Sequence, residues 1–377
     1  MGSYNSSSKN GDEFNNQTES SGLNKINSKY IIIKILENLN TVRALQIIKY
    51  NKKIIGKLNL DKNYFKDFSE TKTTIEIGLI LFKKKYGTFI NYSDENISSY
   101  FHIFFNDIDV DRKRNYLNKN EQVENIKIKI DYFLESFSHL FENCTCIKSI
   151  NFIKFHRTNV KDMNHMFSGC YSLKEINFLN FNTNNVTNMS NMFSLCSSLK
   201  TINLQNFKTD NVTNMSCMFS GCSDLEELDV KKLSTNNVTN MSSMFSGCSL
   251  LKELDLSNFK TEKVTLMGKM FYQCYKLEEI NVSSFDTENV TDMSYMFSGC
   301  TSLMKLNLSN FKSDNVKNKS FMFSRCSSLI EINISKSKFY ISSYDITTCK
   351  MFNRSNKELV EEIEQKYNNL NINNNDF

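Results

Sequence analysis

The chain has 377 residues, which is enough for two domains or for one domain and a repeat array. Its formal net charge of +5 is small for this length, and we therefore expect no nucleic acid as a partner. The longest apolar run, residues 75–82, is far shorter than the roughly 20 residues of a transmembrane helix. Residues 1–28 lack the apolar core of a signal peptide, so we expect a cytoplasmic protein, with the cell surface as the alternative.

Residues 1–28 are rich in Ser, Asn and Lys, and they predict a disordered polar tail. Gly2 followed by Ser6 matches the pattern for N-myristoylation. One acyl chain anchors a protein only marginally, so the pattern predicts weak membrane association through Gly2. The alternative is a chance match in a Ser-rich segment.

Residues 29–135 predict an α+β region that caps the N-terminal end of the neighbouring repeat array. Apolar side chains recur at helical spacing over residues 29–68. The pattern then changes to strands over residues 73–132, where isoleucines and lysines alternate cleanly at residues 126–130.

An internal repeat of 26 residues dominates residues 136–340. Leu140-Phe141 opens the first of eight units, and Met-Phe pairs open the others at Met166, Met192, Met218, Met244, Met270, Met296 and Met322. Four residues after each start stands a cysteine, at Cys144, Cys170, Cys196, Cys222, Cys248, Cys274, Cys300 and Cys326. Eight cysteines on one period indicate eight copies of one structural unit.

Each unit predicts a short strand, a turn and a short helix. The Leu-x-Leu alternation, as at Leu254 and Leu256, indicates the strand. The Met-x-x-Met-Phe-x-x-Cys spacing, as from Met189 to Cys196, indicates the helix, with Asn188 as its N-cap. No unit can bury its apolar face alone, so we expect stacked units whose parallel strands form one sheet roughly 40 Å long, at about 4.8 Å per strand.

Candidate chemistry is sparse. Stacking brings the cysteines of successive units within disulfide range, at about 5 Å, but a thiol shared by every unit is better explained as a small buried side chain. The histidines show no zinc-ligand spacing; they are His102, His139, His156 and His165. No phosphate-binding loop or nucleophile motif is present, so we expect no metal, no cofactor and no catalytic residue.

Residues 341–377 predict a C-terminal cap helix and tail. Ser355 and Glu358 have the spacing of a capping box. One apolar helix face comes next, made of Leu359, Val360, Ile363 and Tyr367.

The consensus unit at residues 237–259 reads Asn-Val-Thr-Asn-Met-Ser-Ser-Met-Phe-Ser-Gly-Cys-Ser-Leu-Leu-Lys-Glu-Leu-Asp-Leu-Ser-Asn-Phe. It resembles the BspA-like leucine-rich repeat family in its 26-residue surface-protein form, over about residues 137–340. The resemblance implies an α/β solenoid, a right-handed coil of short strands and short helices, that binds proteins or surfaces. Many bacterial members are surface adhesins, whereas this chain shows no secretion signal.

Leucine-rich solenoids usually bind on the exposed face of their parallel strands, where two polar columns flank the buried Leu or Ile. The candidate binding face comprises Glu175, Asn177, Asn203, Glu227, Asp229, Glu253, Asp255, Glu279, Asn281 and Asn307. The face is mildly acidic, and the alternative is a solvated face with an Asn ladder along the stack. Units that deviate from the consensus are candidates for discrimination, at Tyr272, Gln273, Tyr275, Lys231 and Lys232.

The sequence therefore predicts a non-enzymatic scaffold or recognition surface with a protein partner whose identity it does not reveal. One alternative is an adhesin-like surface protein. Another is an F-box-like ubiquitin-ligase substrate adapter, because residues 30–58 resemble an F-box, although its usual early Pro and later Trp are absent.

Overall fold

The computed structural model describes residues 28, 31–32, 54, 75–92, 98, 100–130, 134–155, 160–334, 339–347 and 349–373. The chain divides into two compact units, residues 1–74 with 131–133, and residues 75–130 with 134–377. Outside the described residues lie residues 1–27 of the predicted polar tail, with Gly2, nearly all of the helical, F-box-like stretch, His156 and the side chain of Tyr367. The second of these compact units contains all the repeats.

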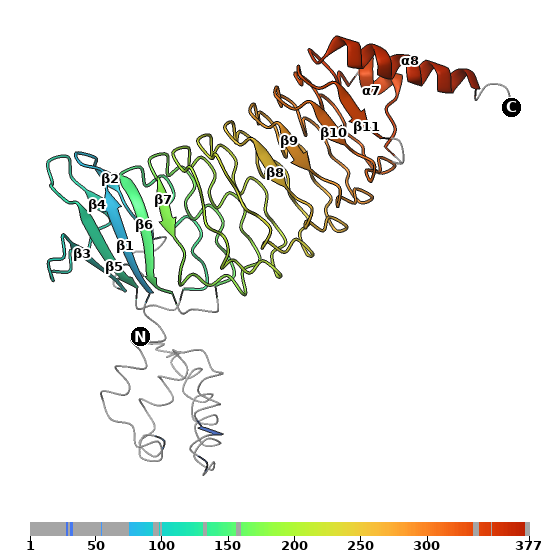
Figure 1. Cartoon of the computed structure of the whole chain (residues 1–377). Helices are drawn as coiled ribbons and strands as arrows, with labels where there is room; N and C mark the ends of the chain where they lie inside the picture. The colour runs from blue at the N-terminus through green and yellow to red at the C-terminus, as the bar shows by residue number, and fades with distance from the viewer. Residues whose placement is uncertain are drawn as a thin grey trace, which may run out of the picture. The chain divides into compact units, whose positions relative to one another are not determined.

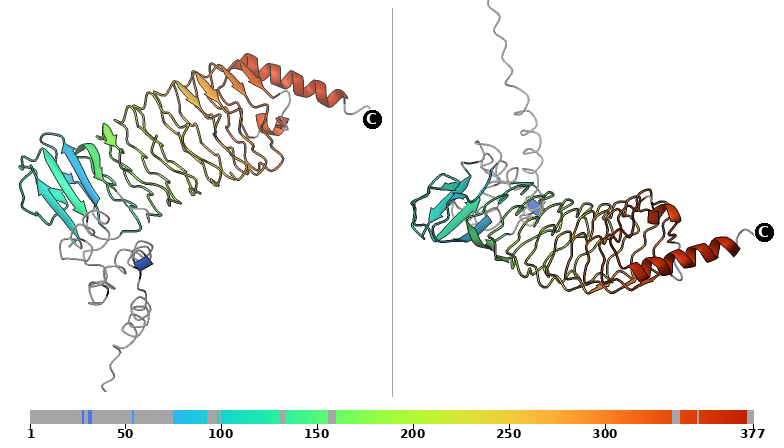
Figure 2. Two further views of the ribbon diagram at one scale, coloured as in Figure 1. Left: turned by 60° about the horizontal axis from the view of Figure 1, so that its bottom comes forward. Right: turned by 90° about the horizontal axis from the view of Figure 1, so that it is seen from above.

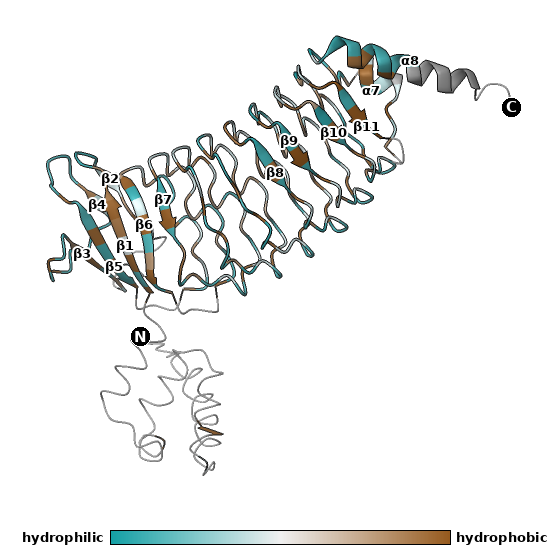
Figure 3. Ribbon diagram, in the orientation of Figure 1, coloured by the Kyte–Doolittle hydropathy of each residue, from teal (hydrophilic) through white to brown (hydrophobic). Residues whose placement is uncertain are grey.

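An antiparallel sheet lies at the start of the second compact unit (Figure 1). It contains β1 (Ile75–Leu81), β3 (Phe101–Phe105) and β5 (Asn125–Ile130), and a small hairpin pairs β2 (Gly87–Thr88) with β4 (Tyr116–Leu117). The isoleucines of β5 are buried and its lysines are half-buried, so hydrophobic and hydrophilic residues alternate along it (Figure 3). The strands predicted from alternation are therefore confirmed in this region.

The sheet continues from these strands into the repeats. Its strand order is β3-β5-β1-β6-β7. β6 (Ile147–Lys154) pairs antiparallel with β1 on one side and parallel with β7 (Glu175–Asn177) on the other. Because β6 and β7 belong to the first units, the N-terminal strands extend the array by direct hydrogen bonding.

The strand edge, which we define as the Leu-x-Leu segments of all units, is interrupted. Beyond β7 the strands are β8 (Glu253–Asp255), β9 (Glu279–Asn281), β10 (Lys305–Asn307) and β11 (Glu331–Asn333). They form two separate parallel pairs, β8 with β9 and β10 with β11, and residues 201–203 and 227–229 form no strand. The prediction of one continuous eight-stranded sheet is therefore wrong.

The continuous pairing lies instead at the turn edge, which we define as the Met-x-x-Met-Phe-x-x-Cys segments. A chain of parallel bridges runs from Ser136 through Asp162 to Asn318, with one position in each unit. In the second repeat the amides of Met163 and Phe167 donate to the carbonyls of Asn188 and Met192, at 3.0 and 2.9 Å. The repeats thus stand side by side in one row that ends at the C-terminal helix (Figures 1 and 2).

The short helices predicted for each unit are wrong, because residues 160–334 contain no helix. The segment instead makes successive tight turns, in which the amides of Met166 and Cys170 donate to carbonyls three residues earlier. His165 and Gly169 have φ of 53° and 71°, in the left-handed region that ends a helix. Asn188 is accordingly no helix cap, and its Oδ1 accepts the amide of Ser190 in an Asx turn.

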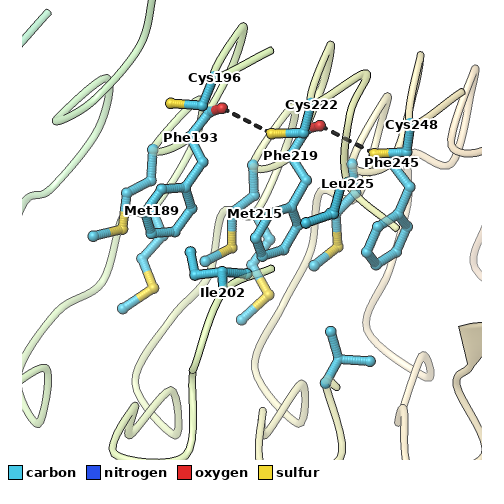
Figure 4. Packing of buried hydrophobic residues seen from close by; sticks show 14 of the residues in the cluster. Met189, Phe193, Cys196, Ile202, Met215, Phe219, Cys222, Leu225, Phe245 and Cys248 are labelled. Atoms are coloured by element: carbon cyan, nitrogen blue, oxygen red, sulfur yellow. Dashed lines mark hydrogen bonds between the residues drawn. The ribbon is translucent and has the colours of Figure 1, made fainter. Parts of the chain in front are cut away.

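A stack of phenylalanines forms the middle of the core (Figure 4). Phe141 and its equivalents lie parallel, with ring centroids 5.2–5.8 Å apart from each unit to the next. The methionines of each turn, such as Met189 and Met215, are fully buried beside the rings. Each unit therefore buries its apolar face only against its neighbours.

The C-terminal end contains one turn more than the eight predicted units. The amide of Phe323 donates to the carbonyl of Met351 at 2.9 Å, and Phe352 extends the ring stack. Two helices lie at this end of the described chain, α7 (Ser343–Thr347) and α8 (Lys357–Asn373).

The predicted capping box at Ser355 is wrong. Asn356 caps α8, because its Oδ1 accepts the amide of Glu358 at 3.0 Å. The hydroxyl of Ser355 donates instead to the carbonyl of Phe323. No helix among the described residues is long and apolar enough to cross a membrane.

Candidate functional site

The predicted polar columns lie on the strand edge, and all ten candidate residues are exposed except Asp255, which is half-buried. The structure gathers part of the set around one hollow of about 1060 Å³. The candidates that line it are Glu227, Asp229, Glu253, Asp255, Glu279 and Asn281. The others, Glu175, Asn177, Asn203 and Asn307, do not line the hollow.

The Asn/Asp column has a structural task that the repeat pattern did not reveal. The Oδ1 atoms of Asp229, Asp255 and Asn281 each accept the backbone amide two residues later, at 3.0–3.1 Å. The same Asx turn ends the segments at Asn177, Asn203 and Asn307. An amide and a carboxylate both supply this acceptor, so the turn explains why the column holds only Asn or Asp.

The glutamates that stand two residues before this column, which we call the Glu column, have no such structural task. In the part of the chain that the structure describes, no hydrogen bond or ion pair involves the side chains of Glu227, Glu253 and Glu279. Glu253 and Glu279 are directly opposite each other in the β8–β9 pair. Like charges in that position destabilise a sheet, so these side chains do not serve the fold.

The hollow is negatively charged overall, since seven acidic and three basic side chains line it. Lys231, which deviates from the repeat consensus, is one of the lysines, and its Nζ lies 3.5 Å from Asp255. Hydrogen bonds from Ser257, followed by the nearby Lys231, lower the pKa of Asp255. Half-buried Leu228 and Ile280 add apolar surface to the lining.

The cysteine column is part of the core. All eleven cysteines are free, and those of the column are fully buried. Cys222 Sγ donates to the carbonyl of Phe193 in the preceding unit at 3.1 Å, and Cys248 donates likewise to Phe219 at 3.3 Å (Figure 4). Burial raises the pKa of Cys222 to about 12, which makes its thiol a poor nucleophile.

The histidines form no metal site in the described part of the chain, where no cluster of His, Cys, Asp or Glu could hold a metal ion. His139 and His165 stack with centroids 4.8 Å apart. Burial, and then the neighbouring His139, lower the pKa of His165. His102 Nδ1 lies 2.8 Å from Asp111.

The deviating residues of the sixth unit lie elsewhere, at the turn edge. Tyr272, Gln273 and Tyr275 line a second hollow of about 190 Å³. Arg325, which was not among the residues predicted from the sequence, lies beside them although it is 50 residues further along the chain than Tyr275. The sequence feature that could have identified Arg325 is that it replaces the glycine of the consensus unit.

Comparison with known proteins gives one family match. A family model described as Mycoplasma protein of unknown function, DUF285, matches residues 135–254 and 250–367. No curated protein matches the chain.

Two solved structures are similar at low level. The crystal structure of a TLR13–ssRNA13 complex is 15% identical, with 49% of this chain and 28% of that chain covered and a TM-score of 0.24. The Leptospira interrogans LRR protein LIC12759 is also 15% identical, with 52% and 65% covered and a TM-score of 0.19. The chain spans less than two thirds of either structure's length, and no conclusion rests on TM-scores this low.

Proposed function

Because the chain belongs to the family described as Mycoplasma protein of unknown function, DUF285, its role has to come from its own residues, and we propose a non-enzymatic scaffold whose strand edge binds a protein partner. The finer resemblance to BspA-like repeats, with a right-handed coil, is part of this proposal, as is a cytoplasmic location. The hollow on the strand edge is the binding surface.

The Glu column carries the proposal. The side chains of Glu227, Glu253 and Glu279 make no hydrogen bond or ion pair within the described residues, and Glu253 and Glu279 are opposed in adjacent strands. The fold would be at least as stable with neutral side chains there. An unpaired carboxylate column that lines a hollow is therefore better explained by a partner than by stability.

The chemistry of the hollow favours a basic segment as the partner. Seven carboxylates would meet lysine or arginine side chains, and complementary charge speeds association and excludes acidic competitors. Leu228 and Ile280 would add apolar contact beneath the charged groups.

The test compares two triple variants of the full chain in quantitative affinity purification from the native cell. E227Q/E253Q/E279Q neutralises the Glu column of the hollow. D210N/E262Q/D314N neutralises the same number of charges at exposed positions that do not line the hollow. We expect a basic protein that the parent chain and the second triple retain and the first triple loses.

The urea midpoint of the first triple should equal or exceed that of the parent chain. If both triples retain the same proteins as the parent, the strand edge is not the binding surface. If the first triple is markedly less stable, the carboxylates serve the fold and no partner is needed to explain the Glu column.

A further inference from the structure

At two adjacent positions of the turn edge, the sixth and eighth units carry large side chains, whereas the seventh unit between them carries small ones. The position after each Phe of the repeat is Glu142 in the first unit, Ser168, Ser194, Ser220 and Ser246 in the second to fifth, and Tyr272 in the sixth. The next position is glycine in four units, and it is Asn143 in the first, Leu195 in the third, Gln273 in the sixth and Arg325 in the eighth. The seventh unit, between them, keeps the small pair Ser298 and Gly299.

This alternation makes a notch one unit wide, with a volume of about 190 Å³. Tyr272 and Gln273 line it from one neighbouring unit and Arg325 from the other. Gly299, with φ of 82°, lies between them, and a Cβ there would approach the Cα of Gln273 to 3.3 Å. Tyr295 also lines the notch, edge-on to the ring of Tyr272 at 6.1 Å.

Arg325 is the charged residue among those that line the notch, and none of the lining residues is acidic. Arg325 is exposed, and within the described residues its guanidinium has no hydrogen bond or ion pair. Lys269 Nζ lies 5.6 Å from the ring centroid of Tyr295. The ninth turn adds Lys350 and Arg354, which are exposed and have the left-handed backbone conformation of Arg325.

We propose that this notch is a second binding site, which takes one carboxylate side chain of an acidic peptide. A guanidinium binds a carboxylate through two parallel hydrogen bonds, and the phenols of Tyr272 and Tyr295 supply further donors. The volume equals that of roughly six water molecules, which suits one side chain and is below the size of common small-molecule pockets. Lys350 and Arg354 would meet further acidic residues of the same peptide.

The site is independent of the proposed function, because it uses the turn edge and positive charge, whereas the hollow uses the strand edge and negative charge. Variants of one surface leave the other intact, so either proposal can fail alone.

The test measures fluorescence anisotropy of a fluorescein-labelled hexaglutamate peptide with the full chain. A labelled hexaglutamine peptide is the matched control for charge. The variant R325G restores the consensus glycine at a position with φ of 61°, so it should fold normally. L195G makes the same change in the third unit, where φ is 60°, and serves as the control variant.

We expect hexaglutamate to bind, hexaglutamine not to bind, R325G and Y272S each to weaken binding at least fivefold, and L195G to bind as the parent does. Y272S changes no charge, so an unchanged affinity would reduce the site to diffuse attraction and overturn the proposal. Failure of hexaglutamate to bind would also overturn it. So would tighter, Arg325-dependent binding of an oligonucleotide with six phosphates, which would make the notch a nucleic-acid site.

Discussion

The buried thiol column predicts that the repeat array unfolds in mild alkali. Burial raises the pKa of all eight column cysteines, and for Cys170, Cys222, Cys274 and Cys326 it reaches about 12. An exposed thiol titrates at about 8.5. Between these values the unfolded chain loses protons that the folded chain keeps, so the free energy of unfolding falls as pH rises from about 8.5 towards 12. Below about pH 8.5 the full stability is present.

The loss in free energy of unfolding is set by the difference in proton binding between the folded and the unfolded chain. At pH 9 each unfolded thiol gains about 0.8 kcal/mol by ionising, and at pH 10 about 2 kcal/mol. Over eight thiols the loss is about 7 kcal/mol at pH 9 and about 16 kcal/mol at pH 10. A domain is typically stable by about 5–15 kcal/mol, so we expect an unfolding midpoint between about pH 9 and pH 10.

Far-UV circular dichroism from pH 7 to 11, with reductant and constant ionic strength, measures the midpoint. The control variant C196S/C222S/C248S replaces three thiols by hydroxyls that do not ionise but can still donate to the same carbonyls. Its loss of stability between pH 8 and pH 10 should be smaller by about 6 kcal/mol. A full signal at pH 11, or an equal pH dependence in the variant, would refute the reasoning.

Four further predictions concern single positions, each measured by urea denaturation. Leu254→Ala removes a side chain that is 3% exposed and should lower stability by about 2–5 kcal/mol, so an unchanged midpoint would contradict the strand-edge register. Asp255→Asn should stay within about 0.5 kcal/mol of the parent because the Asx turn survives, whereas Asp255→Ala should lose about 1 kcal/mol. Lys319→Met removes the cationic partner of buried Asp345, at 2.9 Å, and leaves the carboxylate with the hydrogen bonds from Ser342, so it should cost about 3–5 kcal/mol. Lys305→Met breaks an exposed pair and should cost at most about 1 kcal/mol.

The array and its core could be predicted from spacing alone, because a residue that recurs every 26 positions must meet its own copy in a stack. Helices could not be told from turns in the same way. Met189, Met192, Phe193 and Cys196 have the spacing of a helix face, but two successive turns bury the same positions. The residues with left-handed backbone conformation distinguish the turns from a helix. In the sequence, only the recurring glycine of the consensus indicated them.

The candidate site could be predicted only in part. The outward direction of Glu253 and Asp255 could be inferred from strand alternation. Their different roles could not, because the Asx turn and the opposed glutamates depend on backbone hydrogen bonds and on register. The ninth turn at Met351 was missed because 29 residues separate it from Met322, so it falls outside the period.

The two edges of the array have different structural roles. Parallel bridges run without interruption along the turn edge from Ser136 to Asn318, whereas the strand edge loses its pairing at residues 201–203 and 227–229 without breaking the row. The turn edge therefore holds the units together, and the strand edge is free to accept charges that do not favour pairing. The turn edge tolerates Arg325 because its backbone amide still donates to the next turn, at the carbonyl of Asn353. At this position a change of side chain therefore leaves the inter-unit hydrogen bond unchanged.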